Sequence, residues 1–363
     1  MHIAAVRAFA LYRPGTVGHY GGPYAALVRI ETDDGLVGWG EADSSPVVIK
    51  AIVEAPFQDE LMAGLASLLV GQDPREPAAL WPRMLRGTSQ FGRAGAALQA
   101  MAACDLALWD IAGQAAGVPV HRLLGETRRS RLEVYATHPL GPTPEASAAH
   151  ARTLVARGFT GIKMGWAPLG PDPDRDEAFV RALRDAVGPR VRLLIDGGNA
   201  WDAPAALERC RRFAPYDLTW LEEPLAPEDT DGYREVTQAG PMTIAAGELC
   251  STARELDALS EAGVGVIQID ISRVGLTQGL ALARRVAARG GRIVNHTYTH
   301  ALNLVASLHL MAVAPAVSLC EVQANPNALG AALFPDTPLA EAGYVRVPTR
   351  PGLGIAPDPA ALA

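Results

Sequence analysis

The chain has 363 residues, of which 49% are hydrophobic and 20% are charged, and its formal net charge is −7 at pH 7. The length and composition are typical of a well-packed soluble protein with one large and one smaller domain, or with two ordinary domains. The negative charge argues against a surface for nucleic acid or for an anionic membrane, because both require basic patches. It does not exclude a small anionic substrate, since a metal ion or a local lysine can reverse the sign of the charge inside a cleft.

Neither the cysteines nor the amino terminus suggests a secreted or membrane protein. The cysteines lie far apart without CxxC spacing, which excludes a zinc ribbon or a redox pair. The first residues lack a charged start followed by a long apolar core, and no run reaches about 18 apolar residues. We therefore expect a soluble cytoplasmic protein with buried, reduced thiols, namely Cys104, Cys210, Cys250 and Cys320.

The first third of the chain has the pattern of an α+β domain. Residues 25–42, AALVRIETDDGLVGWGEA, predict two strands joined by a DDG turn. Ala- and Leu-rich segments with helical periodicity follow from about residue 49 to residue 125, for example residues 94–117. Strands followed by helices in this way indicate an α+β unit.

From about residue 131, short apolar runs alternate with helical segments. Eight such runs with intervening helices predict a (β/α)7β barrel of the TIM type, and an open eight-stranded sheet is the alternative. The tail is rich in Pro and Gly and has no barrel period. We therefore expect an N-terminal α+β domain over residues 1–128, a barrel over 129–325 and a C-terminal segment over 326–363 that returns to the N-terminal domain. The eight runs are RLEVYATH, FTGIKMGW, VRLLIDGG, LTWLEEP, MTIAAGE, VGVIQID, GRIVNH and VSLCEV.

Ionisable residues end seven successive strands of the predicted barrel. In such a barrel the chemistry takes place where strands end, so these groups would crowd one mouth. Unpaired acids there would repel one another strongly, and the excess of negative charge predicts a bound cation. The seven residues are Lys163, Asp196, Glu222, Glu248, Asp270, His296 and Glu321.

Three of these acids form a candidate metal site. Asp196, Glu222 and Glu248 come from consecutive strands, so their carboxylates can converge on one point. Carboxylates without clustered Cys or His favour a hard cation, with Mg²⁺ as the first choice. Glu222 is preferred to its neighbour Glu223, because the faces of a strand alternate and only one of the two can point inward.

His296 is the candidate general base. It ends the seventh strand, and Asp270 ends the neighbouring sixth strand, so a carboxylate can orient the imidazole and strengthen it as a base. Lys163 faces the acid-rich mouth, where its ammonium can pair with a carboxylate of the protein or of a substrate. Glu321 could donate a hydrogen bond to a developing enolate oxygen if protonated, or form a salt bridge to Lys163. His300 is expected to belong to the following helix without a role, whereas His138, at the end of the first strand, could contact substrate.

These seven residues, on a barrel preceded by an α+β domain, resemble the enolase superfamily. The motifs LLIDGG, WLEEPL and AAGE, the Asp270–His296 pair and the segment ALWDIAGQAAGVPVHRLLGE are similar to the mandelate racemase subgroup. The resemblance implies one Mg²⁺ per active site, held by the three acids and bound to a substrate carboxylate. It also implies that His296 removes the proton α to that carboxylate, while the metal, Lys163 and Glu321 stabilise the enediolate.

The resemblance further implies a capping domain whose loops choose the substrate. A mixture of polar and aromatic residues in these loops suits a hydroxylated, anionic molecule such as a sugar acid, bound by a protein that we expect to be a homo-oligomer. Trp166, just beyond the second strand, could shape the substrate space. The candidate substrate contacts from the capping loops are His19, Tyr20, Tyr24 and Arg93.

Two positions depart from the racemases of that subgroup. Their second strand carries Lys-x-Lys, and the second lysine acts on the face opposite the histidine, but Gly165 stands at that position here. The glycine would leave space for a larger substrate. The third strand reads DGGN instead of Asp-x-Asn, so the amide that would contact substrate is displaced to Asn199 or lost.

The missing second base favours elimination over racemisation. Racemisation needs two opposed bases, whereas His296 alone can remove the α proton and then protonate a leaving 3-hydroxyl on the same face. The expected activity is syn-dehydration of a sugar acid to a 2-keto-3-deoxy acid. The alternatives are a cycloisomerase of a sugar lactone or anhydro sugar acid, an epimerase with a base elsewhere, and a non-catalytic barrel that binds sugar acids.

Overall fold

The structure is a computed structural model that describes residues 1–13, 22, 24–325 and 327–362. Its N-terminal part is an antiparallel sheet in the order β1-β2-β3, packed against helices. The strands are β1 (Ile3–Tyr12), β2 (Tyr24–Thr32) and β3 (Val37–Ala42). The helices are α1 (Pro46–Glu54), α2 (Leu65–Leu69), α3 (Pro77–Gly87), α4 (Ala96–Ala116) and α5 (Val120–Leu124).

Helix α4 is buried along most of its length and joins this domain to the rest of the molecule. One side packs on β3 so closely that a Cβ atom on Gly40 would lie 1.8 Å from the carbonyl oxygen of Ala103. Only glycine, which has no Cβ, permits this approach. The other side packs on the barrel helix α11 (Ile271–Ala288), where Asp105 accepts a hydrogen bond from the backbone N–H of Thr277 at 2.9 Å.

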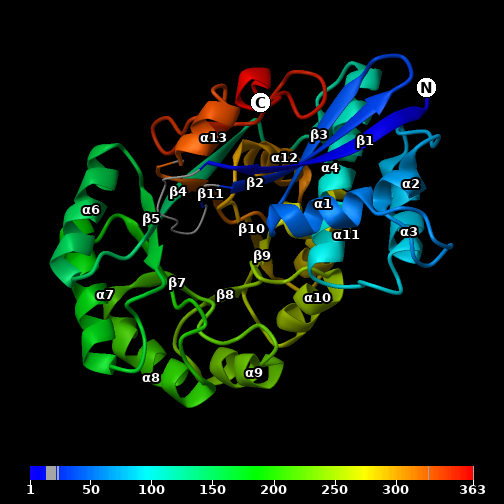
Figure 1. The fold of residues 1–363 in the computed structure, drawn as a ribbon. Helices are drawn as coiled ribbons and strands as arrows, with labels where there is room; N and C mark the ends of the chain where they lie inside the picture. The colour runs from blue at the N-terminus through cyan, green and yellow to red at the C-terminus, as the bar shows by residue number, and fades with distance from the viewer. Residues whose placement is uncertain (14–21, 23, 326, 363) are drawn as a thin grey trace.

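The second part is a parallel sheet that curls into a barrel, with its helices outside the strands (Figure 1). The order of the strands is β10-β9-β8-β7-β6-β5-β4-β11. Their bounds are β4 (Arg131–Pro139), β5 (Gly161–Gly165), β6 (Arg192–Asp196), β7 (Leu218–Glu222), β8 (Ile244–Ala246), β9 (Val266–Ile269), β10 (Arg292–Asn295) and β11 (Cys320–Gln323). The other helices are α6 (Pro144–Ala156), α7 (Pro173–Val187), α8 (Ala203–Phe213), η1 (Ala214–Tyr216), α9 (Thr230–Ala239), α10 (Ala253–Glu261) and α12 (Ala301–Val313).

The two ends of this sheet meet, so the predicted barrel is confirmed and the alternative of an open sheet is wrong. Strand β11 pairs with β4. On its other side, Ile293 of β10 forms a bridge with Val317, just before β11. Further along, the Asn295 side chain accepts from the backbone N–H of Glu321 at 2.8 Å and donates to the carbonyl oxygen of Glu321 at 3.1 Å. An amide side chain thus supplies the two hydrogen bonds that a strand backbone would make, and closes the barrel at the mouth.

Alternation along the strands sorts the barrel interior into a buried apolar level and a polar mouth. Leu194 and Trp220 belong to the interior cluster. Two residues further on lie Asp196 and Glu222, which therefore point to the same side of their strands. The full interior cluster consists of Tyr135, Leu194, Trp220, Ala245, Val266, Val294 and Leu319.

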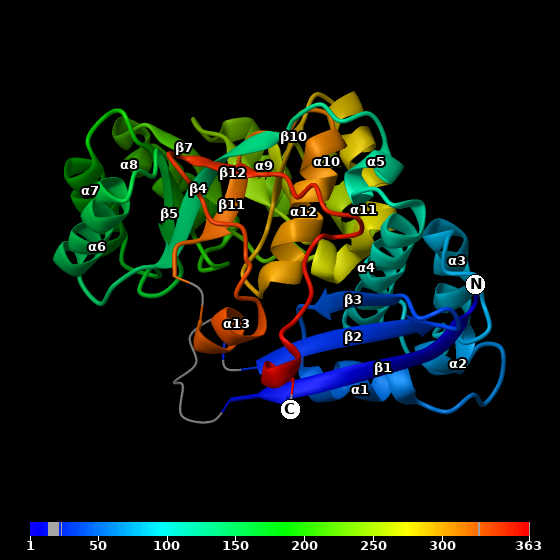
Figure 2. The same ribbon diagram turned by 90° about the horizontal axis from the view of Figure 1, so that it is seen from above.

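The tail contacts both parts of the molecule (Figure 2). It contains α13 (Ala328–Leu333), β12 (Tyr344–Arg346) and η2 (Pro359–Ala361). Strand β12 pairs antiparallel with the barrel strand β4, and Leu353 then donates its N–H to Asp110 of α4 at 2.8 Å. The proposed division at residues 128 and 325 stays a prediction.

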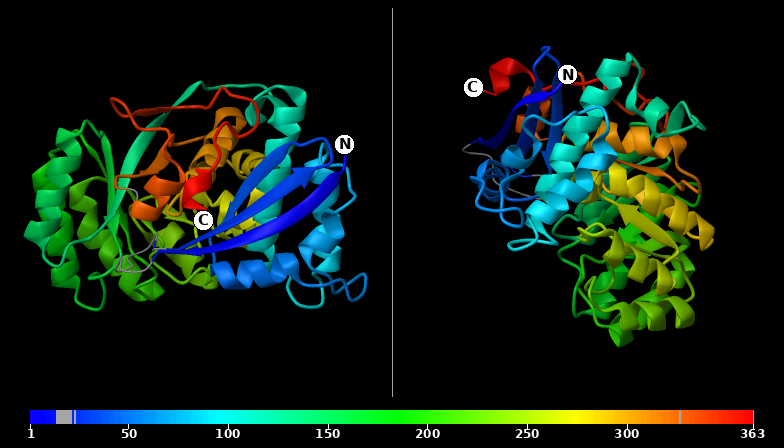
Figure 3. Two further views of the ribbon diagram at one scale, coloured as in Figure 1. Left: turned by 45° about the horizontal axis from the view of Figure 1, so that its top comes forward. Right: turned by 90° about the vertical axis from the view of Figure 1, so that its right-hand side faces the viewer.

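Figure 3 shows the N-terminal domain seated against one side of the barrel, where it can act as a cap; we call it the capping domain. All four cysteines are buried free thiols, as expected. Among the described residues, no helix combines the length and the apolar character needed to cross a bilayer.

Candidate active site

A cavity of about 1050 Å³ lies between the barrel mouth and the capping domain. Its walls include Lys163, Asp196, Glu248 and His296, which lie in the barrel strands or just after them. The capping domain contributes Gly22, Tyr24, Asp43, Ser44, Ser45 and Gln99. The cavity therefore brings predicted catalytic and metal-binding residues under the domain that was expected to cover them.

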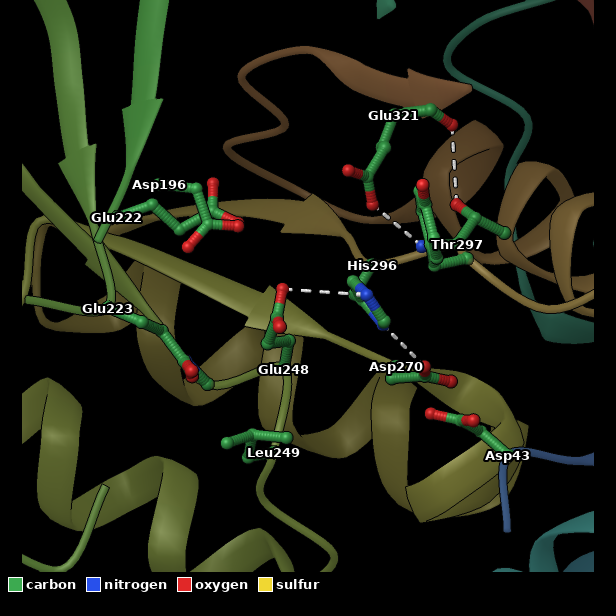
Figure 4. Close-up of polar contacts among 12 residues, drawn as sticks. Asp43, Asp196, Glu222, Glu223, Glu248, Leu249, Asp270, His296, Thr297 and Glu321 are labelled. Atoms are coloured by element: carbon green, nitrogen blue, oxygen red, sulfur yellow. Dashed lines mark hydrogen bonds and ion pairs between the residues drawn. The ribbon is translucent and has the colours of Figure 1, made fainter. Parts of the chain in front are cut away.

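Asp196, Glu222 and Glu248 converge as the sequence predicts. Each offers one carboxylate oxygen, and these three oxygens lie within 4.8 Å of one another (Figure 4). All three residues are at most 4% exposed. The backbone N–H of Gly198 donates to Asp196 at 2.9 Å, and the indole N–H of Trp220 donates to Glu222 at 3.1 Å. The donor set consists of carboxylate oxygens only, so it fits a hard divalent cation such as Mg²⁺.

The electrostatics of these acids are those of a cluster that a divalent cation would stabilise. Burial and the neighbouring Glu222 raise the pKa of Asp196 well above its usual range. Burial likewise raises the pKa of Glu248, to about 8, although His296 opposes this. Burial also acts to raise the pKa of Glu222, but Lys163 outweighs it and leaves that pKa below its usual value. A divalent cation would stabilise all three carboxylates in the ionised form.

Glu223 is buried beside the three converging carboxylates but is not one of them. It is fully buried, and its carboxylate accepts from the backbone N–H of Gly247 at 3.1 Å. Burial and the nearby Asp196 raise its pKa to about 7. It does not belong to the group of three converging oxygens, which agrees with the preference for Glu222.

Lys163 is the buried cation at the centre of the carboxylates. Its ammonium pairs with Glu222, lies 2.8 Å from Glu321, and lies 3.7 Å from Asp196. Burial acts to lower the pKa of Lys163, but Glu222 and Glu321 outweigh it and hold the pKa well above its usual value. The ammonium is therefore charged. Of the two roles left open for Glu321, the salt bridge to Lys163 is present. The other oxygen of Glu321 accepts a hydrogen bond from the backbone N–H of Thr297 at 2.7 Å.

His296 and Asp270 form the expected pair. The Nδ1 atom of His296 lies 2.7 Å from Asp270, and Nε2 lies 3.4 Å from Glu248 (Figure 4). Because the carboxylate of Asp270 can only accept, Nδ1 carries a hydrogen and Nε2 faces Glu248. The Asn303 amide and the Ser272 hydroxyl also donate to Asp270, at 3.1 and 2.6 Å, and hold it in place.

The pKa of His296 depends on the carboxylate beside it. Burial acts to lower this pKa, but Glu248 and the hydrogen bond with Asp270 outweigh it and raise the pKa to about 10. This pKa is that of His296 beside carboxylates that no cation neutralises. Neutralising Glu248 would remove the largest contribution that raises the pKa, and would favour the neutral imidazole that a base requires.

Gly165 lines the cavity, as the expectation of substrate space requires, but the position of its missing Cβ is not open. Strands β5 and β6 approach so closely that a Cβ atom on residue 165 would lie 2.2 Å from the carbonyl oxygen of Asp196 and 2.3 Å from its Cβ. A side chain at this position would displace Asp196, one of the three predicted metal ligands. A lysine at position 165, where the racemases carry their second base, would therefore require β5 or β6 to shift.

The displaced amide of Asn199 faces away from the cavity. In the orientation that satisfies its neighbours, its nitrogen donates to the carbonyl oxygen of Leu225 at 2.7 Å and to Glu223 at 3.2 Å. Trp166 occupies the neighbouring wall, and its indole N–H donates to Asp196 at 3.1 Å. Asn199 thus supports Glu223, whereas Trp166 lines the cavity as expected.

The other candidate substrate contacts divide into three groups. Tyr24 and His138 line the cavity. Arg93 is exposed and is not part of the described cavity wall, so the structure does not bring it to the site. His19 and Tyr20 lie outside the described residues.

Several cavity residues are not singled out by the sequence pattern. Arg273 pairs with Asp43 of the capping domain at 2.6 Å. Tyr298 and His300 follow His296 in the segment HTYTH and also line the cavity; His300 lies at the start of α12, as expected, but it is a cavity residue as well. The clue in the sequence is the density of polar residues after the seventh strand. The partners of these residues, 230 to 259 positions away, cannot be inferred from it.

Comparisons with known proteins agree with this architecture. Residues 146–361 match the family described as enolase C-terminal domain-like, and residues 16–125 match the mandelate racemase / muconate lactonizing enzyme N-terminal domain. The chain is 30% identical to the D-galactarolactone cycloisomerase of Agrobacterium fabrum, over 91% of this chain and 88% of that protein. It is 34% identical to the D-galactonate dehydratase of Ralstonia nicotianae, over 93% of this chain and 90% of that protein.

A solved structure is similarly close. The 3,6-anhydro-D-galactonate cycloisomerase from Zobellia galactanivorans superimposes with a TM-score of 0.89 at 29% identity, covering 100% of this chain and 98% of that one. The matched regions include both the capping domain and the barrel with its strand-end residues. The chain therefore belongs to the mandelate racemase and muconate lactonizing enzymes of the enolase superfamily.

Proposed function

We propose that this enzyme dehydrates a sugar acid to a 2-keto-3-deoxy acid, with His296 as both base and acid. The observation that carries the proposal is the oriented pair of His296 and Asp270 beside three converging carboxylates. A non-catalytic binding protein would not need an oriented base. The relatives named as dehydratases and cycloisomerases of sugar acids support the class of substrate.

Asp196, Glu222 and Glu248 would hold one Mg²⁺. When bound, the cation acts as a Lewis acid that lowers the free energy of negative charge on the substrate carboxylate. Lys163, whose ammonium Glu321 holds at 2.8 Å, would contact the same developing charge from the barrel interior.

His296 would carry out both proton transfers. Its Nε2 takes the α proton, and the electron pair left on the α carbon expels the 3-hydroxyl group. The resulting imidazolium, stabilised by Asp270, returns the proton to that leaving group, which departs as water. The enol product then becomes the 2-keto-3-deoxy acid. One base on one face is sufficient for this sequence, and Gly165 offers no second one.

The cycloisomerase reaction is the second candidate, because two of the relatives carry that name. The same base would enolise the substrate, and a ring oxygen would leave in place of hydroxide. The two reactions differ in their products. Dehydration lowers the mass by one water molecule, whereas cycloisomerisation leaves the mass unchanged.

The charges of the cavity favour a substrate with a single carboxylate. Lys163 and Arg273 are the Lys and Arg side chains among the described lining residues, and both already pair with acids of the protein. The segments 14–21, 23 and 326 contain neither Lys nor Arg. A second carboxylate would therefore be buried without a permanent cation as its partner, which is costly. Many of the other lining groups are hydroxyls and amides, which suit a polyhydroxy chain.

A substrate screen tests the proposed function. Aldonates, aldarates and sugar lactones would be incubated with enzyme and Mg²⁺, and the products scored by mass and by a 2-keto assay. We expect dehydration of an aldonate, with aldarates at least about 100-fold poorer in kcat/KM, and loss of activity after exhaustive dialysis against EDTA that added Mg²⁺ restores. Full activity after that dialysis would contradict the metal site, and a product of unchanged mass would favour the cycloisomerase.

A further inference from the structure

A second pair of imidazole and carboxylate spans the junction of the capping domain and the barrel. Glu41 lies on β3 of the capping domain, and His300 lies at the start of α12 in the barrel. The Nδ1 atom of His300 is 2.8 Å from Glu41, and the two side chains are 3% and 1% exposed. Because a carboxylate accepts, Nδ1 carries the hydrogen and Nε2 is left for another partner.

The Glu41 carboxylate is itself fixed by the barrel. Its second oxygen accepts from the backbone N–H of Asn303, in the first turn of α12, at 3.2 Å. The side chain of Asn303 donates to Asp270 at 3.1 Å. One residue of α12 thus contacts both carboxylates that orient an imidazole of the cavity, so His300 is held in a defined position relative to His296.

The Nε2 atom of His300 is buried and has no hydrogen-bond partner within the described part of the chain. The side chain nevertheless lines the cavity. On its other side the ring packs on α13, where a Cβ atom on Gly330 would lie 2.8 Å from Cδ2 of His300. A buried polar atom without a partner costs free energy, and a site in a cavity wall allows a ligand to supply the partner.

We propose that His300 is a substrate-binding residue whose Nε2 accepts a hydrogen bond from a substrate hydroxyl beyond C3, on the cavity side covered by the capping domain. Glu41 is the positioning residue that keeps the hydrogen on Nδ1. This assignment rests on the proposed sugar-acid function and deepens it. The site would therefore require one hydroxyl of the substrate. A substrate without that hydroxyl would leave Nε2 of His300 buried without a partner.

The test compares substrates that differ by one hydroxyl. D-galactonate, D-gluconate and their derivatives lacking a single hydroxyl beyond C3 would be measured with the native enzyme and with His300→Phe. We expect the native enzyme to discriminate against one of these deoxy derivatives by at least about 100-fold in kcat/KM, and His300→Phe by less than about five-fold. Exchange of the α proton by His296 should remain detectable in the variant.

Two further variants keep the test decisive. Glu41→Gln can present an N–H group to Nδ1. It should therefore reduce the ratio of kcat/KM between the parent sugar acid and its deoxy derivative. Gly330→Ala keeps the imidazole but displaces it, because the added Cβ would contact Cδ2. If His300→Phe does not fold, the discrimination between substrates is measured with Gly330→Ala instead. Gly170→Ala is the matched control, because a Cβ atom at Gly170 meets nothing within 4 Å.

The outcomes separate the two proposals. If the folded variants turn over substrate with unchanged ratios of kcat/KM between parent and deoxy substrates, the assignment of His300 is overturned. The residue would then only connect the capping domain to the barrel. Absence of both turnover and α-proton exchange with every sugar acid tested would overturn the proposed function itself, and the assignment with it.

Discussion

Lys163 and Gly165 lie on the same face of β5 and have opposite requirements. Lys163 is stable as a buried cation because Glu222 and Glu321 pair with it. Gly165 must lack a side chain because the backbone of Asp196 occupies the position of a Cβ atom. The sequence predicts the charge of the mouth from residue type and spacing. It does not predict the close approach of β5 and β6, which depends on how the barrel curls.

Gly165→Ala is expected to destabilise the protein and weaken metal binding. The added Cβ would lie 2.2 Å from the carbonyl oxygen of Asp196, so β5 or β6 must shift. Overpacking of this kind costs about 1–3 kcal/mol in free energy of unfolding. Urea denaturation measures this cost, and a Mg²⁺ titration measures the displacement of Asp196.

Gly170→Ala again serves as the control, because its Cβ would enter open space. Equal stability of the two variants, with equal affinity for Mg²⁺, would show that β5 and β6 can separate without cost. The second strand could then accept a base, and the argument against racemisation would lose its support.

Three elements from different parts of the chain meet at a buried pair of histidines. His309 of α12 lies 3.1 Å from the Nδ1 atom of His121 of α5, and its Nε2 lies 3.1 Å from the carbonyl oxygen of Leu353 in the tail. The carbonyl can only accept, so Nε2 of His309 carries the hydrogen and Nδ1 accepts from His121. This arrangement requires a neutral His309.

The His309 pair is expected to weaken the protein in acid. Burial lowers the pKa of His309 from 6.5 to about 4. Above pH 6.5 the residue is neutral in both the folded and unfolded states. As the pH falls from 6.5 towards 4, the unfolded state binds a proton that the folded state does not, so stability falls. The loss should reach about 2 kcal/mol near pH 5.

The measurement is the free energy of unfolding of the native protein and of His309→Gln, at about pH 8 and at about pH 5. The Gln side chain keeps a donor and an acceptor but does not titrate. The stability difference between the two proteins should therefore shrink by about 2 kcal/mol in acid. A difference independent of pH would contradict the neutral, buried state of His309.

The order of the elements could be predicted because it depends on local patterns. Short apolar runs and helical segments alternate along the barrel, and an ionisable residue lies within or just after each strand from β5 to β11. The closure of β10 on β11 through Asn295, and the pairing of Glu41 with His300, join residues that are 26 and 259 positions apart. No local pattern encodes such contacts, so the structure is needed to find them.

At the scale of the whole molecule, the capping domain and the barrel build one cavity together. Arg273 forms an ion pair with Asp43, and His300 donates a hydrogen bond to Glu41, so both contacts cross the junction. The barrel supplies the acids and the base, and the capping domain supplies polar groups on the opposite wall. That the barrel carries out the chemistry and the cap selects the substrate stays a prediction.

The central claim is that His296 removes a proton α to a carboxylate. The most direct measurement is exchange of that proton with solvent in D₂O, followed by NMR, for the native enzyme and His296→Asn with Mg²⁺ and the sugar acid identified by the screen. The account predicts deuterium at the α carbon and product formation with the native enzyme, and a loss of both by about 10²- to 10⁴-fold in the variant. Exchange at the native rate in a folded His296→Asn variant would contradict it.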